Sequence, residues 1–150
     1  MSQDPIIEQL RRRVTPDLYR DIRRLWKTHV TAEDARDIPT ILTTLTEDCL
    51  FEVVQTGERW QGHEGAARFH TELFAAFPDI RFRLANIVIG PQGVYQEINV
   101  HATFLADWGS YRAHGRPVTF AILVLYPWDA QQRIFSGERV YVVSDASLGQ

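Results

Sequence analysis

The spacing of hydrophobic residues changes once along the chain, near Ile80, and this change constrains the fold more than any other feature. Before Ile80, hydrophobic residues recur about every 3.6 residues, as on one face of an amphipathic helix. After it they alternate with polar residues in four runs, about 81–89, 94–107, 118–126 and 134–143, separated by turn-forming segments. We therefore predict an α+β fold in which helices precede an antiparallel β-meander.

The first part of the chain is predicted to be mainly helical. Thr15-Pro16-Asp17 is a helix start, with a capping hydroxyl, a proline at the first helical position and an acid in the first turn. Two further helix starts are predicted, at Thr31 and near Asp37. A strand over residues 49–54 and a long helix with an apolar stripe from Ala66 to Phe77 follow. Such helices must cover one face of the sheet, which predicts a cone-shaped, curved antiparallel sheet wrapped around a long helix.

The length of 150 residues predicts one domain, because a chain of this size already buries roughly 70% of its surface in a single core. The sequence contains no internal repeat, no low-complexity tract and no linker-like change in composition. We therefore predict a single domain over residues 1–150, with an N-terminal helical extension over about 1–30.

Charge and hydropathy exclude several classes of partner. The 16 basic against 19 acidic residues give a net charge of −3, which disfavours nucleic acid as a partner. The longest apolar run, 120–126, is far shorter than the roughly 20 residues that cross a bilayer. The first 25 residues contain no apolar segment typical of a secretory signal. These features predict a cytoplasmic protein without a membrane partner.

The sequence also predicts neither a metal nor a cofactor. Cys49 is the only cysteine, so no intrachain disulfide and no cysteine-rich zinc site can form. Histidine and acidic residues do not follow a metal-binding motif. Phosphate-binding loops, dinucleotide fingerprints and serine-hydrolase elbows are missing as well.

Several short motifs occur in an order that is typical of one known family. They are Thr46-Glu47-Asp48, Gly62-His63-Glu64-Gly65, Ala76-Phe77-Pro78-Asp79-Ile80, Gly115-Arg116-Pro117-Val118, Gly137-Glu138-Arg139-Val140-Tyr141 and Leu148-Gly149. The Ala-Phe-Pro-Asp element is the most specific of them. Over roughly residues 30–149 the chain resembles the SnoaL-like polyketide cyclase, or ester cyclase, group of the nuclear transport factor 2-like superfamily. The resemblance implies a cone-shaped fold with its site inside the cone. It also implies a function as a cofactor-free cyclase, an isomerase, an epoxide hydrolase or a pure binding module.

Two positions depart from the pattern of this family. Val143 stands where relatives often carry an acid, two residues after the tyrosine of the last strand. Phe104 stands where relatives often carry a histidine, directly after Ala-Thr in the long strand. Because both replace a polar group by an apolar one, they favour the alternative of a pocket that binds without catalysis.

Glu138 is the first catalytic candidate. It shares a strand face with Ser136 and Val140, and burial among such residues makes a carboxyl group a usable acid or base near neutral pH. A structural ion pair or a hydrogen bond to backbone is the other interpretation. The candidates to polarise the substrate oxygen are Tyr141, Glu97, His101 and His70. Alternation places Tyr141 on the face opposite Glu138 unless a bulge near Gly137 redirects the strand.

Glu97 and His101 are candidates on the polar face of the long strand. If this face lines the cone, the two side chains bracket a small substrate from about 13 Å apart, at about 3.3 Å per residue. If it faces solvent, both are ordinary surface residues, and the amphipathic pattern favours this second interpretation. His70, on the apolar stripe of the long helix, is predicted to point into the cone as a proton-transfer group or as a hydrogen-bonded core residue.

The pocket is predicted to be lined by aromatic residues and by the loop before Gly115. The predicted lining residues are Phe51, Trp60, Phe69, Phe74, Asp107 and Trp108. With the resemblance, they predict a cofactor-free acid/base enzyme for a small hydrophobic carbonyl or polyketide-like compound, acting by cyclisation, isomerisation or hydrolysis. The alternative is a non-catalytic small-molecule-binding or association domain.

Because the run 120–126 is apolar on both faces, we also predict a homodimer through the outer sheet face.

Overall fold

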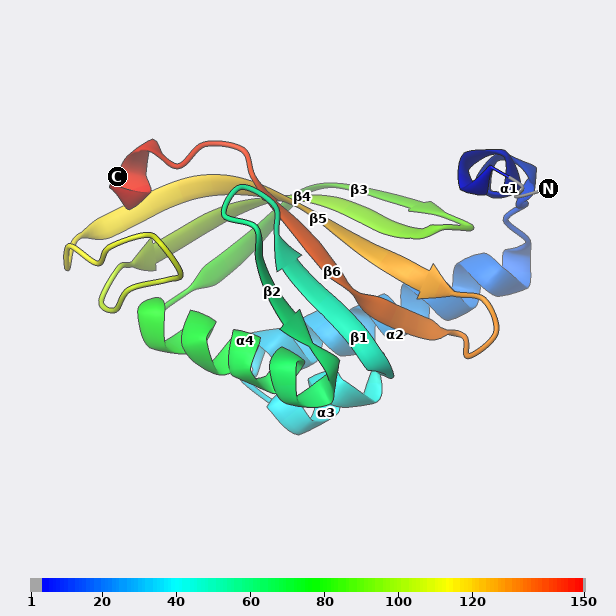
Figure 1. Ribbon diagram of the computed structural model, residues 1–150, viewed down its shortest axis with the longest axis horizontal. Helices are drawn as coiled ribbons and strands as arrows, with labels where there is room; N and C mark the ends of the chain where they lie inside the picture. The colour runs from blue at the N-terminus through cyan, green and yellow to red at the C-terminus, as the bar shows by residue number, and fades with distance from the viewer. Residues whose placement is uncertain (1–3, 150) are drawn as a thin grey trace.

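A curved sheet with helices along one side forms the molecule, as a computed structural model that describes residues 4–149 shows (Figure 1). The helices are α1 (Pro5–Arg11), α2 (Pro16–Asp34), α3 (Ile38–Thr43) and α4 (Gly62–Ala76), with a short 3-10 helix, η1, at Ala146–Leu148. The strands are β1 (Leu45–Val53), β2 (Glu58–Gln61), β3 (Arg81–Gly90), β4 (Gly93–Thr103), β5 (Pro117–Asp129) and β6 (Ile134–Val142). The α+β prediction is confirmed, while residues 1–3 and 150 of the predicted domain lie outside the described residues.

The sheet has six strands in the order β2-β1-β6-β5-β4-β3. The predicted meander is confirmed, because β3 to β6 pair with their neighbours in antiparallel fashion. The prediction of a purely antiparallel sheet is wrong in one pair, since β1 runs parallel to β6. Parallel neighbours need a long connection, and here α4 and the other strands separate β1 from β6. The sheet curves without closing, so β2 and β3 stay at its two edges.

Helix α2 forms one continuous element where two helix starts were predicted. The predicted start at Thr15 is confirmed, since its hydroxyl accepts a hydrogen bond from the Leu18 amide at 3.1 Å. The second start, at Thr31, is wrong because the buried face of α2 continues unbroken from Ile22 to Glu33. The third start is confirmed at Asp37, the N-cap of α3. Helix α1 and the short strand β2 were not predicted.

Strand β6 contains a bulge at Gly137 that changes which residues face the helices. Its pairing with β5 shifts by one residue between Leu125 and Trp128, leaving β6 one residue longer than its partner there. Phe135 lies in the core before the shift, and after it Glu138 and Val140 do. Gly137 adopts a φ of 134°, a backbone conformation that other residues rarely reach. The bulge thus turns Glu138 inward.

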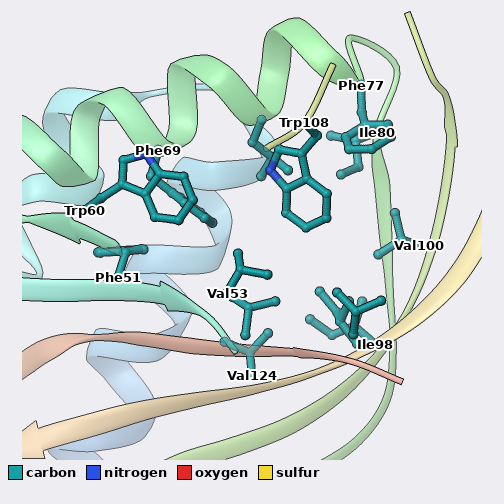
Figure 2. Packing of buried hydrophobic residues seen from close by; sticks show 14 of the residues in the cluster. Phe51, Val53, Trp60, Phe69, Phe77, Ile80, Ile98, Val100, Trp108 and Val124 are labelled. Atoms are coloured by element: carbon teal, nitrogen blue, oxygen red, sulfur yellow. The ribbon is translucent and has the colours of Figure 1, made fainter. Parts of the chain in front are cut away.

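The hydrophobic core lies between α4 and the inner face of the sheet (Figure 2). Phe69 on α4 packs against the rings of Phe51 and Trp60, with centroids 5.0 and 5.1 Å apart. Near the other end of α4, Phe77 stacks on Phe104 at 4.9 Å. Within residues 4–149, no helix combines the length and hydrophobicity that a membrane crossing needs.

Candidate active site

A small cavity of about 30 Å³ opens between the helices and the concave face of the sheet. Most of its wall is apolar: Phe69, Leu73, Ile80, Phe82, Ile98, Val100, Trp108, Phe120, Ile122, Val124 and Val140. Three polar side chains complete the wall, namely Glu33 from α2, Tyr126 from β5 and Glu138 from β6. An apolar pocket with a few convergent polar groups is the usual form of a small-molecule site.

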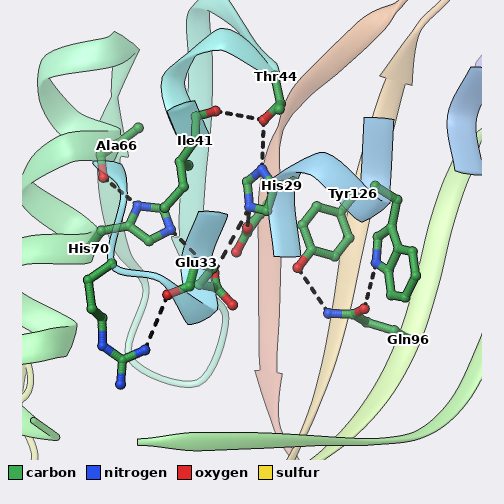
Figure 3. A network of polar contacts seen from close by, with 11 residues as sticks. His29, Glu33, Ile41, Thr44, Ala66, His70, Gln96 and Tyr126 are labelled. Carbon is green, nitrogen blue, oxygen red and sulfur yellow. Dashed lines mark hydrogen bonds and ion pairs between the residues drawn. The ribbon is translucent and has the colours of Figure 1, made fainter. Parts of the chain in front are cut away.

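His29, which Figure 3 labels, forms a hydrogen bond with Glu138 of the cavity wall. The Nε2 atom of His29 lies 2.7 Å from Oε1 of Glu138, and its Nδ1 atom lies 2.7 Å from the Thr44 hydroxyl. That hydroxyl already donates its hydrogen to the carbonyl of Ile41, so it must accept from Nδ1 of His29. With Nδ1 protonated, the contact between Nε2 and Glu138 requires one more proton, carried by the imidazole or by the carboxyl group.

Glu33 faces the second buried histidine, His70 on α4. The Nδ1 atom of His70 donates to the carbonyl of Ala66 at 2.8 Å, because a carbonyl can only accept. Within residues 4–149 its Nε2 atom has no hydrogen-bond partner, and it lies 3.4 Å from Oε2 of Glu33, an ion-pair distance. Both side chains are almost entirely excluded from solvent. A buried charge of this kind is stable only with a partner of opposite charge.

Burial and mutual contact act in opposite directions on this pair. Burial alone would raise the pKa of Glu33, but contact with His70 and the nearby charges of His29 and Arg36 outweigh it and lower that pKa below 4.5. Burial alone would lower the pKa of His70, but contact with Glu33 outweighs it and raises that pKa above 6.5. Between pH 4.5 and 6.5 the pair is therefore a carboxylate and an imidazolium. Its stabilising effect is lost as the pH falls through the lowered pKa of Glu33 or rises through the raised pKa of His70.

Glu33→Gln is expected to lower the pKa of His70 by about one pH unit or more, because burial then acts without the facing carboxylate. The titration of the His70 ring nitrogens, followed by proton–nitrogen NMR, measures this change. His101 is exposed on β4 and serves as the internal control in the same spectra. An unchanged His70 titration in the variant would show that Glu33 does not stabilise the charged form of His70.

The same four side chains have the donor set of a metal site. The ligand atoms of His29, Glu33, His70 and Glu138 lie within 4.8 Å of one another, and two imidazoles with two carboxylates suit a divalent transition metal. A tetrahedral ion with bonds of about 2.1 Å would hold its ligand atoms about 3.4 Å apart. The 2.7 Å contact between His29 and Glu138 is shorter than this and fits a bridging proton. As arranged here, His29 and Glu138 are spaced as hydrogen-bond partners rather than as two ligands of one ion.

The structure brings together two of the five predicted catalytic residues, Glu138 and His70. It places Glu97 and His101 on the exposed face of β4, because alternation gives the buried face to Gln96, Ile98 and Val100. The prediction that either one lies with Glu138 in the cone is therefore wrong.

Tyr141 also lies away from the cluster. It is half-buried on the opposite face of β6, where the guanidinium of Arg139 covers its ring at 5.5 Å. The bulge that was expected to bring Tyr141 inward exists, but it lies before Glu138 in the chain, so alternation still separates the two residues.

Two of the six predicted lining residues, Phe69 and Trp108, line the cavity. Phe51 and Trp60 pack behind Phe69 as core residues. The guanidinium carbon of Arg36 lies over the ring of Phe74, 4.5 Å from the centroid of that ring. The prediction for Asp107 is wrong, because its carboxylate is exposed and accepts hydrogen bonds within its own loop, from Arg112 and the Ala113 amide.

Sequence reasoning missed His29, Glu33 and Tyr126 as site residues. The sequence analysis assigned no role to either His29 or Glu33. Their spacing of four residues puts both on the buried face of α2, which also contains Ile22. That spacing was the available signal, since a histidine and a glutamate one turn apart on a buried stripe need polar partners.

Comparison with known proteins shows which family the chain is similar to. The profile of the SnoaL-like domain matches residues 26–140. No curated protein matches the chain. A SnoaL-like polyketide cyclase candidate from Jannaschia superposes with a TM-score of 0.73 at 13% identity, covering 88% of this chain and 91% of that one.

Two further solved structures are similar. A candidate polyketide cyclase from Pseudomonas putida is 25% identical, with a TM-score of 0.62 over 78% of this chain and 87% of that one. A candidate ketosteroid isomerase from Kribbella flavida is 18% identical, with a TM-score of 0.59 over 84% and 80%. With a family profile that spans most of the sequence and a fold shared with such structures, the chain belongs to the SnoaL-like domain family.

Proposed function

We propose that this protein is a cofactor-free acid/base enzyme of the SnoaL-like type. Its substrate is a small hydrophobic carbonyl or polyketide-like compound, and its reaction is a cyclisation, an isomerisation or a hydrolysis. The observation that carries the proposal is the pair of carboxylates in the wall of a mostly apolar cavity, each in contact with a buried histidine. Carboxylates in such surroundings act as general acids and bases at neutral pH.

Glu138 is the group proposed to accept the substrate proton. Its Oε1 atom is bound to His29, whereas Oε2 has no hydrogen-bond partner among the described residues. His29 stabilises the carboxylate while it is charged and retains the shared proton. Glu33 is the second group in the wall, and His70 behind it stores a proton that Glu33 can relay to the ligand.

Proton exchange next to a carbonyl group tests this proposal without knowledge of the natural substrate. Acetophenone, cyclohexanone and 2-tetralone are incubated with the protein in deuterated water, and NMR follows the replacement of the hydrogens on the adjacent carbon. The enzyme breaks a C–H bond and a solvent deuteron forms the new C–D bond, so no other reactant is needed. We expect faster exchange than in buffer for at least one ketone, and the same rate in the presence of a metal chelator.

A non-catalytic pocket remains the second candidate function. Phe104, which replaces a histidine common in relatives, is completely buried against Phe77 and contributes no polar group. If the ketones bind but exchange at the rate of buffer, and phenyl acetate is not hydrolysed either, the protein is a binding module. Hydrolysis of phenyl acetate without exchange would instead assign it to the hydrolases.

We also propose that the chain is a cytoplasmic homodimer. The outer face of β3 and β4 carries two paired, large and exposed hydrophobic side chains, Val88 and Tyr95. Sedimentation equilibrium at micromolar concentration is expected to give twice the chain mass of 17.3 kDa. A mass of one chain would reject the dimer, and Val88→Glu is expected to shift a dimer towards monomer.

A further inference from the structure

Tyr126 ends a chain of three hydrogen-bonded side chains that begins outside the cavity (Figure 3). The indole nitrogen of Trp26 on α2 lies 2.8 Å from the side-chain oxygen of Gln96 on β4. The side-chain nitrogen of Gln96 lies 2.9 Å from the Tyr126 hydroxyl. Gln96 and Tyr126 are buried, and Tyr126 is part of the cavity wall.

The chemistry of the three groups determines where each hydrogen lies. An indole nitrogen can only donate, so the atom of Gln96 that faces Trp26 must be its oxygen. The amide NH₂ of Gln96 then faces Tyr126 and donates to the phenolic oxygen. Tyr126 has therefore used its oxygen as an acceptor, and its own hydrogen remains to be donated.

This hydrogen has no protein acceptor. Among the described residues, 4–149, Gln96 is the only hydrogen-bond partner of the Tyr126 hydroxyl. A buried O–H group without an acceptor is costly, on the order of 1–3 kcal/mol, unless water or a ligand supplies one. Tyr126 lines the cavity together with Glu33 and Glu138, so a ligand bound there is the available source of an acceptor.

We infer that Tyr126 donates a hydrogen bond to the oxygen atom of a carbonyl ligand in the cavity, and that Trp26 and Gln96 hold its hydroxyl in the donating orientation. The inference deepens the proposed function, on which it rests for the substrate class, by naming the group that polarises the carbonyl. A donor at this point stabilises the negative charge that develops on the oxygen when an adjacent proton is removed. Tyr126 thus takes the role for which the sequence offered Tyr141, Glu97, His101 and His70 as alternatives.

The electrostatic surroundings keep Tyr126 a donor at neutral pH. Burial, together with the charges of Glu138 and Glu33, raises the pKa of the Tyr126 phenol well above its usual value of 10.0. The hydroxyl therefore stays protonated where a carboxyl group has ionised. This division of roles, with carboxylates as bases and a phenol as donor, requires groups of well-separated pKa in one cavity.

Acetophenone and α-methylstyrene test the inference as ligands, because they share one shape and differ in the carbonyl oxygen that accepts a hydrogen bond. Wild-type protein is expected to bind acetophenone more tightly than α-methylstyrene in NMR titrations. Tyr126→Phe, which removes only the hydroxyl, is expected to weaken acetophenone binding about tenfold and to leave α-methylstyrene binding unchanged. Tyr111→Phe is the matched control, since the Tyr111 hydroxyl donates to Asp145 outside this cavity.

Infrared spectroscopy gives a readout that a merely structural role of Tyr126 would not change. The carbonyl stretch of ¹³C-labelled acetophenone should move to lower frequency on binding to wild-type protein and to Tyr111→Phe. In Tyr126→Phe the shift should disappear. Trp26→Phe frees the Gln96 amide to turn over, so a partial loss of the shift is expected there. The double variant Trp26→Phe/Tyr126→Phe should lose no more than Tyr126→Phe alone, because Trp26 acts through Tyr126.

A wild-type protein that does not prefer acetophenone, whether it binds both ligands or neither, would overturn the inference. So would a carbonyl shift that survives in Tyr126→Phe. Because these measurements need no turnover, they separate the two proposals. A carbonyl shift without proton exchange would reject the proposed enzyme function and keep the role of Tyr126. Proton exchange without the carbonyl shift would keep the enzyme function and reject the role of Tyr126.

Discussion

Glu138→Gln is expected to slow ketone proton exchange by at least about a hundredfold, the lower end of what a general base contributes. The reason is chemical, because an amide has nearly the shape of a carboxylate but cannot accept a proton from carbon. Glutamine can still form a hydrogen bond with Nε2 of His29, which in the wild type lies 2.7 Å from Oε1 of Glu138. The substitution should therefore leave the fold intact, as circular dichroism and thermal unfolding would verify.

Glu97→Gln is the matched control, since it makes the same chemical change on the exposed face of the neighbouring sheet region. Its exchange rate is expected to equal that of the wild type. If instead Glu138→Gln exchanges as fast as the wild type while folded, Glu138 is not the base. A slow Glu97→Gln variant would restore the exposed strand face as a candidate site.

Gly137→Ala is expected to destabilise the protein by about 3 kcal/mol or more, or to prevent folding. A Cβ atom at this position would lie 1.9 Å from the carbonyl oxygen of Leu50 in β1, well inside van der Waals contact. The φ angle of 134° is also outside the range that alanine adopts readily. Relief requires moving β1 away from β6, which breaks the one parallel pairing of the sheet.

Gly115→Ala provides the matched control for this prediction. Gly115 has a positive φ of 72°, but a Cβ atom there meets nothing within 4 Å. Gly115→Ala should lower the free energy of unfolding by only about 1 kcal/mol, the penalty of the backbone conformation alone. Urea unfolding of wild type and variants measures the difference. Equal losses in Gly115→Ala and Gly137→Ala would show that the close approach of β1 to Gly137 is not what makes glycine necessary.

Gly137 links the stability of the sheet to the candidate site. The bulge around it places Phe135 and Glu138 on the same inner side, three residues apart, where regular alternation would put them on opposite sides. A folded Gly137→Ala variant with an altered bulge is therefore expected to lose proton exchange as well. The bulge at Gly137 is therefore what allows the neighbouring Glu138 to reach His29.

The sequence by itself determined the features that depend on neighbours in the chain. The helix starts at Thr15 and Asp37, the four strands of the meander and the outward side chain of Glu97 follow from capping and from alternation over a few residues. The family resemblance supported the curved fold and the choice of Glu138 as a catalytic candidate.

Only the tertiary structure decided which polar side chains meet. Glu138 and His29 are separated by 109 positions in the sequence, and no local pattern encodes their contact at 2.7 Å. Glu33 is a charged residue of the kind that usually faces solvent on a helix. Here α4 covers it, and His70 on α4 is its partner. Local periodicity records whether a side chain is buried, because burial on a helix or strand repeats with the geometry of that element. The identity of its partner depends on how separate elements pack and on a one-residue bulge in β6, and only the folded chain specifies these.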